Sequence, residues 1–351
     1  MRLKGYSNIS IFVLLLVPII LFSCSGDKSG SGDSQPAKQQ KAEAKKEIVI
    51  DRETELLLKD LEENGDYANS RLFPSLIKAS SVFEDPSVST HVVDIRDAQD
   101  FATGNLPGSV NIDFRDLPSY FMSGIKPFEF DRIVLVSNDG QLASYTTSLL
   151  RLMGYGNVYA LRWGMSGWNK SFAESGWLAG CSSDFQDRLE TGTTDMPPAR
   201  GMPVLATGFS SGEEIGAARF RQLFGEGLDE VMISAGEVFA SPEDYFVINY
   251  DRRDKYESGH IPGAVRYKPG ATLGLADIMS TIPVDKTVVV YCGTGHNSGF
   301  VTAYLRLFGY DARTLSYGNN GFMYDKMKEE RLTLSWLPFT NENIEDFEVE
   351  K

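Results

Sequence analysis

The sequence predicts an α/β protein built from two three-layer α/β/α domains, each with a central parallel sheet flanked by helices. The first observation is an internal repeat: residues 93–109 align without a gap with residues 248–264, at an offset of 155 positions. The second is that the same offset brings together residues 133–136 and 288–291, which are almost entirely apolar. Strands that are apolar on both faces are typical of parallel sheets covered by helices on each side.

Each copy is predicted to contain the same elements in the same order. A helix-like segment is followed by a strand, a Pro-Gly turn, an irregular stretch, the apolar strand, a glycine loop and a final helix. In the second copy Gly309 is a suitable C-terminal stop for that last helix. The helix itself is predicted from apolar residues at helical spacing, namely Phe300, Val301, Tyr304, Leu305 and Phe308.

The N-terminus is typical of an export signal. Arg2 and Lys4 precede an apolar run over 11–22, which is too short to span a bilayer and ends just before Cys24. The ending Leu-Phe-Ser-Cys resembles the lipobox of bacterial lipoproteins, which implies that Cys24 is lipidated and that the chain lies in the bacterial cell envelope, on the periplasmic side or at the outer membrane. We therefore expect a lipid-anchored protein with a flexible tether and possible partner proteins in the envelope.

These patterns give a predicted domain organisation. The boundaries are a signal peptide at 1–23, a tether at 24–47, a first copy at 66–180, a linker at 181–203, a second copy at 204–340 and an acidic tail at 341–351. The formal net charge of −14 argues against nucleic acid as the main partner, because nucleic-acid binding needs basic surface.

Cys292 is the most reactive-looking residue of the chain. It ends an apolar strand, and a glycine-rich loop and a helix follow it. This arrangement predicts a thiol in a cradle of backbone N–H groups beside the positive end of a helix dipole. Both effects lower a thiol pKa and favour the nucleophilic thiolate.

These features resemble the rhodanese domains, the sulfurtransferase fold. The matching marks are the segment Gly259–Ala264, the loop that follows Cys292, and the pair Gly309-Tyr310. With the duplication, the chain is similar to tandem-rhodanese lipoproteins. The resemblance implies transfer of sulfane sulfur from a thiosulfate- or mercaptopyruvate-type donor to a thiol or cyanide acceptor, through a persulfide on Cys292 and without a cofactor.

The resemblance also implies the surroundings of the persulfide. We expect the cradle and substrate contacts to come from Gly293, Thr294, Gly295, His296, Asn297 and Ser298. The ring of His296 either meets donor or acceptor or faces solvent as an ordinary loop side chain. Candidate anion contacts, which surface salt bridges explain equally well, are Arg252, Arg253 and Arg266.

The two copies differ at the reactive position. Ser137 stands opposite Cys292, and a hydroxyl cannot form a persulfide, so the first copy is expected to be inactive. The second copy departs from the family pattern earlier, because Asn249-Tyr250-Asp251 replaces the Asp94-Ile95-Arg96 of the first.

Other functions are compatible with some of these features. A phosphatase would need an arginine where Ser298 closes the loop, so it is disfavoured. A non-catalytic sulfur- or selenium-carrying or redox-sensing lipoprotein stays open as the alternative. Cys181 is expected to be a lone thiol rather than a partner of Cys292, and the scattered histidines and cysteines show no metal-ligand spacing.

Overall fold

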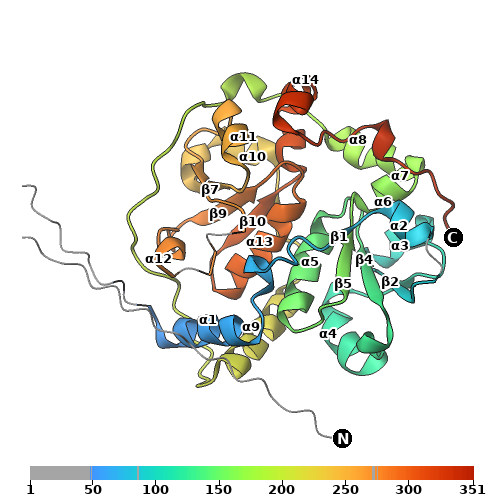
Figure 1. Ribbon diagram of the computed structural model, residues 1–351, viewed down its shortest axis with the longest axis horizontal. Coiled ribbons are helices and arrows are strands. Elements are labelled where there is room, and N and C mark those ends of the chain that lie inside the picture. The colour runs from blue at the N-terminus through green and yellow to red at the C-terminus, as the bar shows by residue number, and fades with distance from the viewer. Residues whose placement is uncertain (1–47, 49, 85–86, 271–272, 275) are drawn as a thin grey trace, which may run out of the picture. The chain divides into compact units, whose positions relative to one another are not determined.

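A computed structural model describes residues 48, 50–84, 87–270, 273, 274 and 276–351, and it contains two five-stranded parallel sheets (Figure 1). The first sheet has the order β1-β5-β4-β2-β3 and the second the order β6-β10-β9-β7-β8, so the two sheets have equivalent topology. The strands are β1 (Leu76–Ile77), β2 (Thr90–Asp94), β3 (Val110–Asn111), β4 (Arg132–Val136), β5 (Val158–Leu161), β6 (Met232–Ile233), β7 (Tyr245–Asn249), β8 (Val265–Arg266), β9 (Thr287–Tyr291) and β10 (Ala312–Leu315). The prediction of two α/β domains with parallel sheets is confirmed.

Helices lie against these sheets and between them. They are α1 (Arg52–Asn64), α2 (Ala79–Phe83), α3 (Ala98–Thr103), α4 (Leu117–Ser119), α5 (Gln141–Leu152), α6 (Gly164–Trp168), α7 (Lys170–Ser175), α8 (Trp177–Gly180), α9 (Gly212–Glu226), α10 (Ala235–Ala240), α11 (Arg253–Ser258), α12 (Ala276–Met279), α13 (His296–Leu307) and α14 (Tyr324–Leu334). Among the described residues, no helix is both long and apolar enough to cross a membrane.

Local sequence signals explain where several helices begin and end. Ser234 and Glu237 form a capping box at the start of α10, in which each side chain bonds the other residue's backbone N–H. Helix α13 ends at Leu307, and Gly309 follows with φ +88° while its N–H donates to the Arg306 carbonyl. The glycine stop predicted for this helix is therefore confirmed.

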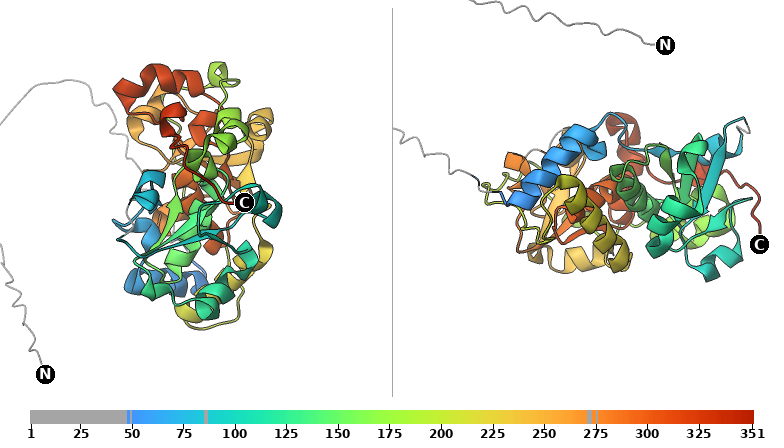
Figure 2. Two further views of the ribbon diagram at one scale, coloured as in Figure 1. Left: turned by 90° about the vertical axis from the view of Figure 1, so that its right-hand side faces the viewer. Right: turned by 90° about the horizontal axis from the view of Figure 1, so that it is seen from below.

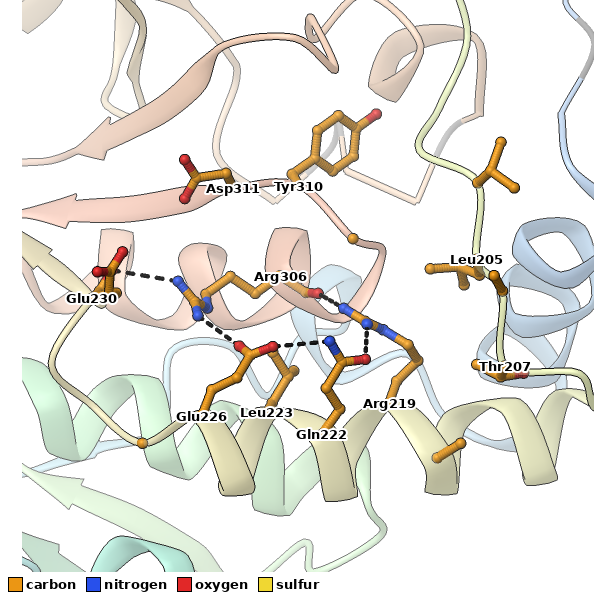
Figure 3. Close-up of a pocket in the computed structure, with 15 residues that line it drawn as sticks. Leu205, Thr207, Arg219, Gln222, Leu223, Glu226, Glu230, Arg306, Tyr310 and Asp311 are labelled. Carbon is orange, nitrogen blue, oxygen red and sulfur yellow. Dashed lines mark hydrogen bonds and ion pairs between the residues drawn. The ribbon is translucent and has the colours of Figure 1, made fainter.

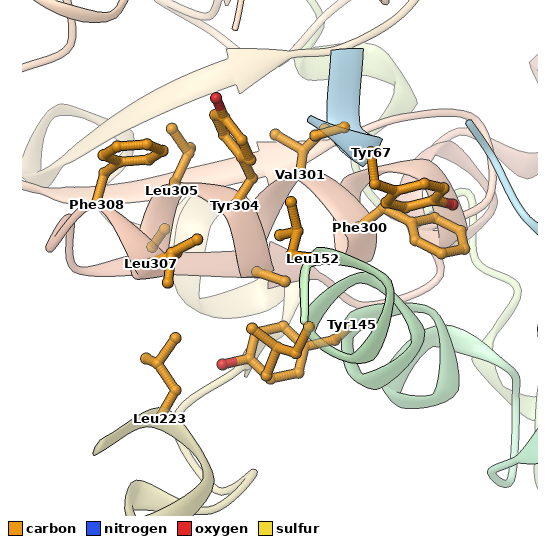
Figure 4. Close-up of a cluster of buried hydrophobic side chains, with 14 of the residues drawn as sticks. Tyr67, Tyr145, Leu152, Leu223, Phe300, Val301, Tyr304, Leu305, Leu307 and Phe308 are labelled. Carbon is orange, nitrogen blue, oxygen red and sulfur yellow. The ribbon is translucent and has the colours of Figure 1, made fainter. Parts of the chain in front are cut away.

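The two copies share one hydrophobic core. Helices α5 and α13 pack together, and the apolar cluster around them includes Tyr145 and Leu152 from the first copy and Val301 and Leu305 from the second, all buried (Figure 4). A Cβ on Gly299 would lie 2.8 Å from the Gln141 carbonyl oxygen, so the close approach of the helices requires glycine there. Burying one such leucine stabilises the fold by about 1.5–3 kcal/mol.

The segment that follows each copy packs on the other copy. Glu190, in the predicted linker, forms a β-bridge with His260, and its carboxylate accepts the Gly263 N–H at 2.8 Å. Glu350, in the predicted tail, forms the equivalent bridge with Asn105 and lies beside the first copy, where Figure 2 shows the C-terminus. The linker and the tail thus hold the two copies together, while residues 1–47 lie outside the described part of the chain.

Candidate active site

The thiol of Cys292 lies directly after β9, at the carboxyl end of the central strand of the second sheet. The residue is 3% exposed. The backbone N–H groups of Thr294 and Ser298 act on its sulfur in the direction that lowers the thiol pKa. The Sγ–H donates to Ser298 Oγ at 3.8 Å, and that hydroxyl donates to the Gly295 carbonyl at 2.9 Å. The loop therefore directs N–H groups of its own backbone toward the sulfur.

The expectation of a lowered thiol pKa is wrong. Burial raises the pKa of Cys292 above its ordinary value, and the negative charge of Asp251 raises it further. The N–H groups of Thr294 and Ser298 lower the pKa, but by less than burial raises it. Burial therefore disfavours the Cys292 thiolate in this structure, and a higher pH is expected to increase the thiolate fraction.

Residues after β10 fix the back of the loop. The Asn319 N–H donates to the Cys292 carbonyl at 3.0 Å, and Asn320 Nδ2 donates to the Gly293 carbonyl at 2.8 Å. Both belong to a 3-10 helix, Gly318–Gly321. Because the neighbouring turn binds these two carbonyl oxygens, it fixes the loop backbone and with it the N–H groups that act on the sulfur. Sequence reasoning missed this support, although Gly318 and Gly164 correspond with a slip of one residue from the offset that aligns the copies.

His296 is placed differently from both sequence expectations. It starts α13 and is completely buried, so it neither faces solvent nor reaches a donor entering at Cys292. Its Nε2 accepts the Trp163 N–H at 3.2 Å, which leaves the ring proton on Nδ1, 2.9 Å from Thr294 Oγ1. The ring packs between the indoles of Trp163 and Trp177 from the first copy. His296 is therefore a contact between the copies, because an imidazole can satisfy one donor and one acceptor in an apolar interface.

Gln141, the counterpart of His296 in the first copy, makes the reciprocal contact. Its Oε1 accepts the N–H of Tyr317, which follows β10, at 2.6 Å. Tyr317 and Trp163 both have left-handed φ values, 62° and 67°. The loop after β4 is thus held by Tyr317 of the second copy, and the loop after β9 is held by Trp163 of the first copy.

Acid is expected to weaken the contact that His296 makes between the copies. The variant His296→Gln should lack this pH dependence. Burial lowers the pKa of His296 to about 3, with the nearby charge of Arg162 adding to the effect, against 6.5 for an ordinary histidine. Between these values the unfolded chain binds the proton and the folded chain does not, so stability falls as the pH falls from 6.5 toward 3. The loss from this residue is at most about 1.4 kcal/mol per pH unit.

Urea unfolding at pH 7, 5.5 and 4.5 measures this difference. Glutamine can accept the Trp163 N–H as Gln141 accepts that of Tyr317, so the variant is expected to fold and to lose less stability on acidification than the wild type. Equal losses in the two proteins would contradict the assignment of the slope to His296.

The remaining cradle and anion-contact residues have mixed placements. Asn297, Gly293 and Thr294 are partly exposed around the loop. The three candidate anion contacts border an open hollow of about 550 Å³: Arg252 pairs with Asp254 at 2.8 Å, Arg253 pairs with Glu257 at 2.9 Å, and Arg266 Nε donates to the Asp251 carbonyl at 2.9 Å. All three arginines therefore already have protein partners.

The equivalent loop of the first copy is filled by its own serine. Ser137 Oγ accepts the N–H groups of Gly140 at 3.0 Å and Ala143 at 3.2 Å, and the residue is 3% exposed. The hydroxyl thus uses the N–H groups that a reacting group would need. Cys181, like Cys292, is a free thiol in the structure, and burial raises its pKa to about 12.

A separate cavity of about 740 Å³ lies between α9, the end of α13 and residues 204–207 (Figure 3). Arg306 pairs there with Glu226 at 2.8 Å, and Arg219 donates to the Arg306 carbonyl at 2.6 Å. These contacts join two helices, and the cavity includes none of the residues of the Cys292 loop. In the described ranges no cluster of three or more His, Cys, Asp or Glu side chains is arranged to hold a metal.

Comparisons with known proteins agree with this architecture. A family profile described as the rhodanese-like domain matches residues 78–171 and 240–325, one range in each copy. A curated relative, a tRNA uridine(34) hydroxylase from Teredinibacter turnerae, is 27% identical over 144 residues, which cover 39% of this chain and 41% of that protein. The chain thus matches less than half of that relative's length.

Two solved structures are similar in part. A rhodanese-related protein from Thermoplasma volcanium is 19% identical with a TM-score of 0.23, covering 28% of this chain and 91% of that one. A thiosulfate sulfurtransferase from Pseudomonas aeruginosa is 18% identical with a TM-score of 0.25, covering 75% of this chain and 45% of that one. The family profile spans half of the sequence and both sheets, and on that ground the chain belongs to the rhodanese-like domain family, of which it carries two copies.

Proposed function

We propose that this protein is a sulfurtransferase that carries sulfane sulfur as a persulfide on Cys292. The observation that supports the proposal best is the position of Cys292 at the carboxyl end of β9, where the N–H groups of Thr294 and Ser298 favour the thiolate. Loops at the carboxyl ends of parallel strands are the usual ligand sites of such folds. The donor is of the thiosulfate or mercaptopyruvate type or a related sulfane compound, and the acceptor is a thiol or cyanide.

The chain's residues have simple tasks in this reaction. The Cys292 sulfur attacks the outer sulfur of the donor, the donor's sulfur bond breaks, and the donor remnant leaves with the bonding electrons. The N–H groups of Thr294 and Ser298 stabilise negative charge on the sulfur while the bond forms. The acceptor then attacks the outer sulfur of the persulfide and restores the Cys292 thiolate. Because the resting thiol is protonated, its proton must leave as the donor reacts.

The first copy contributes support rather than chemistry in this proposal. Its Ser137 hydroxyl is held by its own loop, whereas Trp163 and Trp177 bury His296 at the start of α13. The second copy thus depends on the first for the rigidity of its reactive loop.

A non-catalytic carrier or redox sensor is the second candidate. Its specific support is the 3% exposure of Cys292 together with its raised thiol pKa, since both slow turnover. The name of the curated relative also makes tRNA a candidate substrate. The net charge of −14 does not favour that substrate for this chain.

We further propose that the chain is exported and lipid-anchored at Cys24 in the bacterial cell envelope, where partner proteins would meet it. This proposal rests on the N-terminal sequence alone, because residues 1–47 lie outside the described part. Mass analysis of the N-terminal peptide tests it, since a mature chain that begins with unmodified Met1 would contradict both cleavage and lipidation.

Incubation of the purified protein with a sulfur donor tests the main proposal. We expect intact-mass and peptide analysis to find one added sulfur atom on Cys292, and expect added thiol or cyanide to remove it. Cys292→Ser should carry no adduct and transfer no sulfur. If the wild type acquires no sulfur from thiosulfate, 3-mercaptopyruvate or an alkyl persulfide, the proposed function is wrong. If the adduct forms but is not passed on to any acceptor, the carrier function replaces it.

A further inference from the structure

A buried carboxylate faces the reactive loop without being part of it. Asp251 lies two residues after β7 and is 7% exposed. Its Oδ1 accepts the Arg252 N–H at 3.2 Å and lies 3.5 Å from the Lys255 ammonium nitrogen. Its Oδ2 is buried and has no hydrogen-bond partner among the described residues. A buried acceptor in this state is costly unless a ligand or water completes it.

The unpaired oxygen is directed at the residue that follows the nucleophile. A Cβ placed on Gly293 would lie 3.7 Å from Asp251 Oδ2, which is van der Waals contact. Ionised Asp251 also raises the pKa of the Cys292 thiol, while burial raises the pKa of Asp251 above its ordinary value. The short distance from Gly293 and the effect of Asp251 on the thiol pKa both indicate that a donor reaching the Cys292 sulfur comes close to Asp251 Oδ2.

The cations near Asp251 offset its charge only in part for an incoming anion. Arg252 and Arg253 pair with other carboxylates, and Arg266 donates to a carbonyl. Lys255 lies 3.5 Å from Oδ1 and 4.9 Å from the centre of the Trp336 ring, and it makes no hydrogen bond to Oδ2. The loop from Gly293 to Ser298 contains no lysine or arginine.

The first copy has the opposite charge at this position. Arg96, the counterpart of Asp251, pairs with buried Asp94 at 2.6 Å, and Asn249 stands where Asp94 would be. The residue two positions after the strand is therefore a cation in the inactive copy and a carboxylate in the copy that carries the thiol, where Lys255 is its ion-pair partner. An additional negative charge beside the nucleophile is unfavourable for anionic donors.

We propose that Asp251 determines the class of sulfur donor, disfavouring oxyanions such as thiosulfate and selecting the protonated form of an alkyl persulfide, whose S–H hydrogen-bonds to Asp251 Oδ2. This inference rests on the proposed function of Cys292 and specifies its donor. The hydrogen bond would satisfy the unpaired oxygen and orient the outer sulfur of the donor toward Cys292. A thiosulfate dianion would instead bring two negative charges against a carboxylate oxygen that has no hydrogen-bond partner among the described residues.

The reaction with this donor is balanced without another reactant. The Cys292 sulfur bonds to the outer sulfur of R–S–S–H, and the bond between the two donor sulfurs breaks. The thiolate R–S⁻ leaves with the electron pair and takes up the proton released from the Cys292 thiol. The products are the Cys292 persulfide and the thiol R–SH, with no net oxidation or reduction.

Rates of sulfur loading onto Cys292 test the proposal in the purified full-length protein. The probes are 2-hydroxyethyl persulfide and thiosulfate, each followed by the mass of the Cys292 peptide. We expect the persulfide to react at least about tenfold faster with the wild type, and expect Asp251→Asn to reduce that ratio roughly tenfold, mainly by accelerating thiosulfate. Lys255→Met should increase the ratio, because it removes the cation that partly neutralises Asp251.

Asp244→Asn is the matched control, since this exposed carboxylate lies just before the same strand and should leave the ratio unchanged. A faster reaction with thiosulfate in the wild type, or an unchanged ratio in both Asp251→Asn and Lys255→Met, would overturn the donor assignment while leaving the persulfide function intact. If Asp251 had only a structural role, its substitution would change the loading rates with persulfide and with thiosulfate equally. A changed ratio of the two rates therefore excludes a purely structural role. Failure of both probes to load Cys292 in every variant would overturn the proposed function as well.

Discussion

Gly318→Ala is expected to destabilise the protein by roughly 2–5 kcal/mol and to reduce sulfur loading of Cys292 by more than about tenfold. Gly318 has φ +54°, and a Cβ there would lie 2.1 Å from the Cys292 carbonyl oxygen and 2.6 Å from the Gly295 nitrogen. The loop must therefore move if the fold is to accept a methyl group. Moving it displaces the N–H groups that face the sulfur. Chemical unfolding and the mass of the Cys292 peptide measure the two effects.

Two glycines serve as controls for this substitution. Gly164 of the first copy has φ +57°, and a Cβ there would lie 2.1 Å from the Ser137 carbonyl oxygen, so Gly164→Ala should cost similar stability with much less effect on sulfur loading. Gly263 has φ +73° but open space around its Cβ position, so Gly263→Ala should cost only about 1–2 kcal/mol. Equal loading by the Gly318→Ala variant and the wild type would show that this turn does not position the reactive loop.

Arg96→Met is expected to destabilise the protein by about 3–5 kcal/mol. The Arg96 guanidinium bonds both carboxylate oxygens of Asp94 and also donates to the Asp100 and Gly104 carbonyls. The side chains of the ion pair are 2% and 0% exposed. Methionine fills a similar volume but leaves the Asp94 charge buried without a partner. Urea unfolding at neutral pH measures the loss.

The paired variant Asp94→Asn with Arg96→Met should recover part of that loss, because the second copy uses Asn249 at the equivalent position, where its Oδ1 accepts the Asp251 N–H at 3.2 Å. Lys126→Met is the surface control: its ion pair with Glu129 is mostly exposed and should contribute less than about 1 kcal/mol. If Arg96→Met cost no more than Lys126→Met, the buried pair would not stabilise the first copy.

The main features of the fold were predictable because local patterns carry them. The apolar strands before Ser137 and Cys292 predicted the central strands β4 and β9, and the offset between the copies predicted two sheets of equal topology. Gly309 predicted the end of α13. Each of these features depends on neighbours in the sequence, so a single chain was sufficient to find them.

The site was predicted less completely. The sequence pattern indicated Cys292 and its loop. It predicted a lowered thiol pKa because only the loop N–H groups and the helix dipole can be inferred from neighbouring residues. The larger effects are burial and the charge of Asp251, a residue 41 positions earlier in the chain. Similarly, His296 was expected in an open loop, but Trp163 and Trp177 of the other copy cover it.

By itself, then, the sequence determined the duplicated α/β fold, the family resemblance and the asymmetry between Ser137 and Cys292, since residue identity and short-range periodicity encode all three. Only the tertiary structure decided how the two copies brace each other and which charge faces the thiol. The physical reason is that burial and electrostatics depend on distances in space. The contacts that set them join residues such as Gln141 and Tyr317, which lie far apart in the chain.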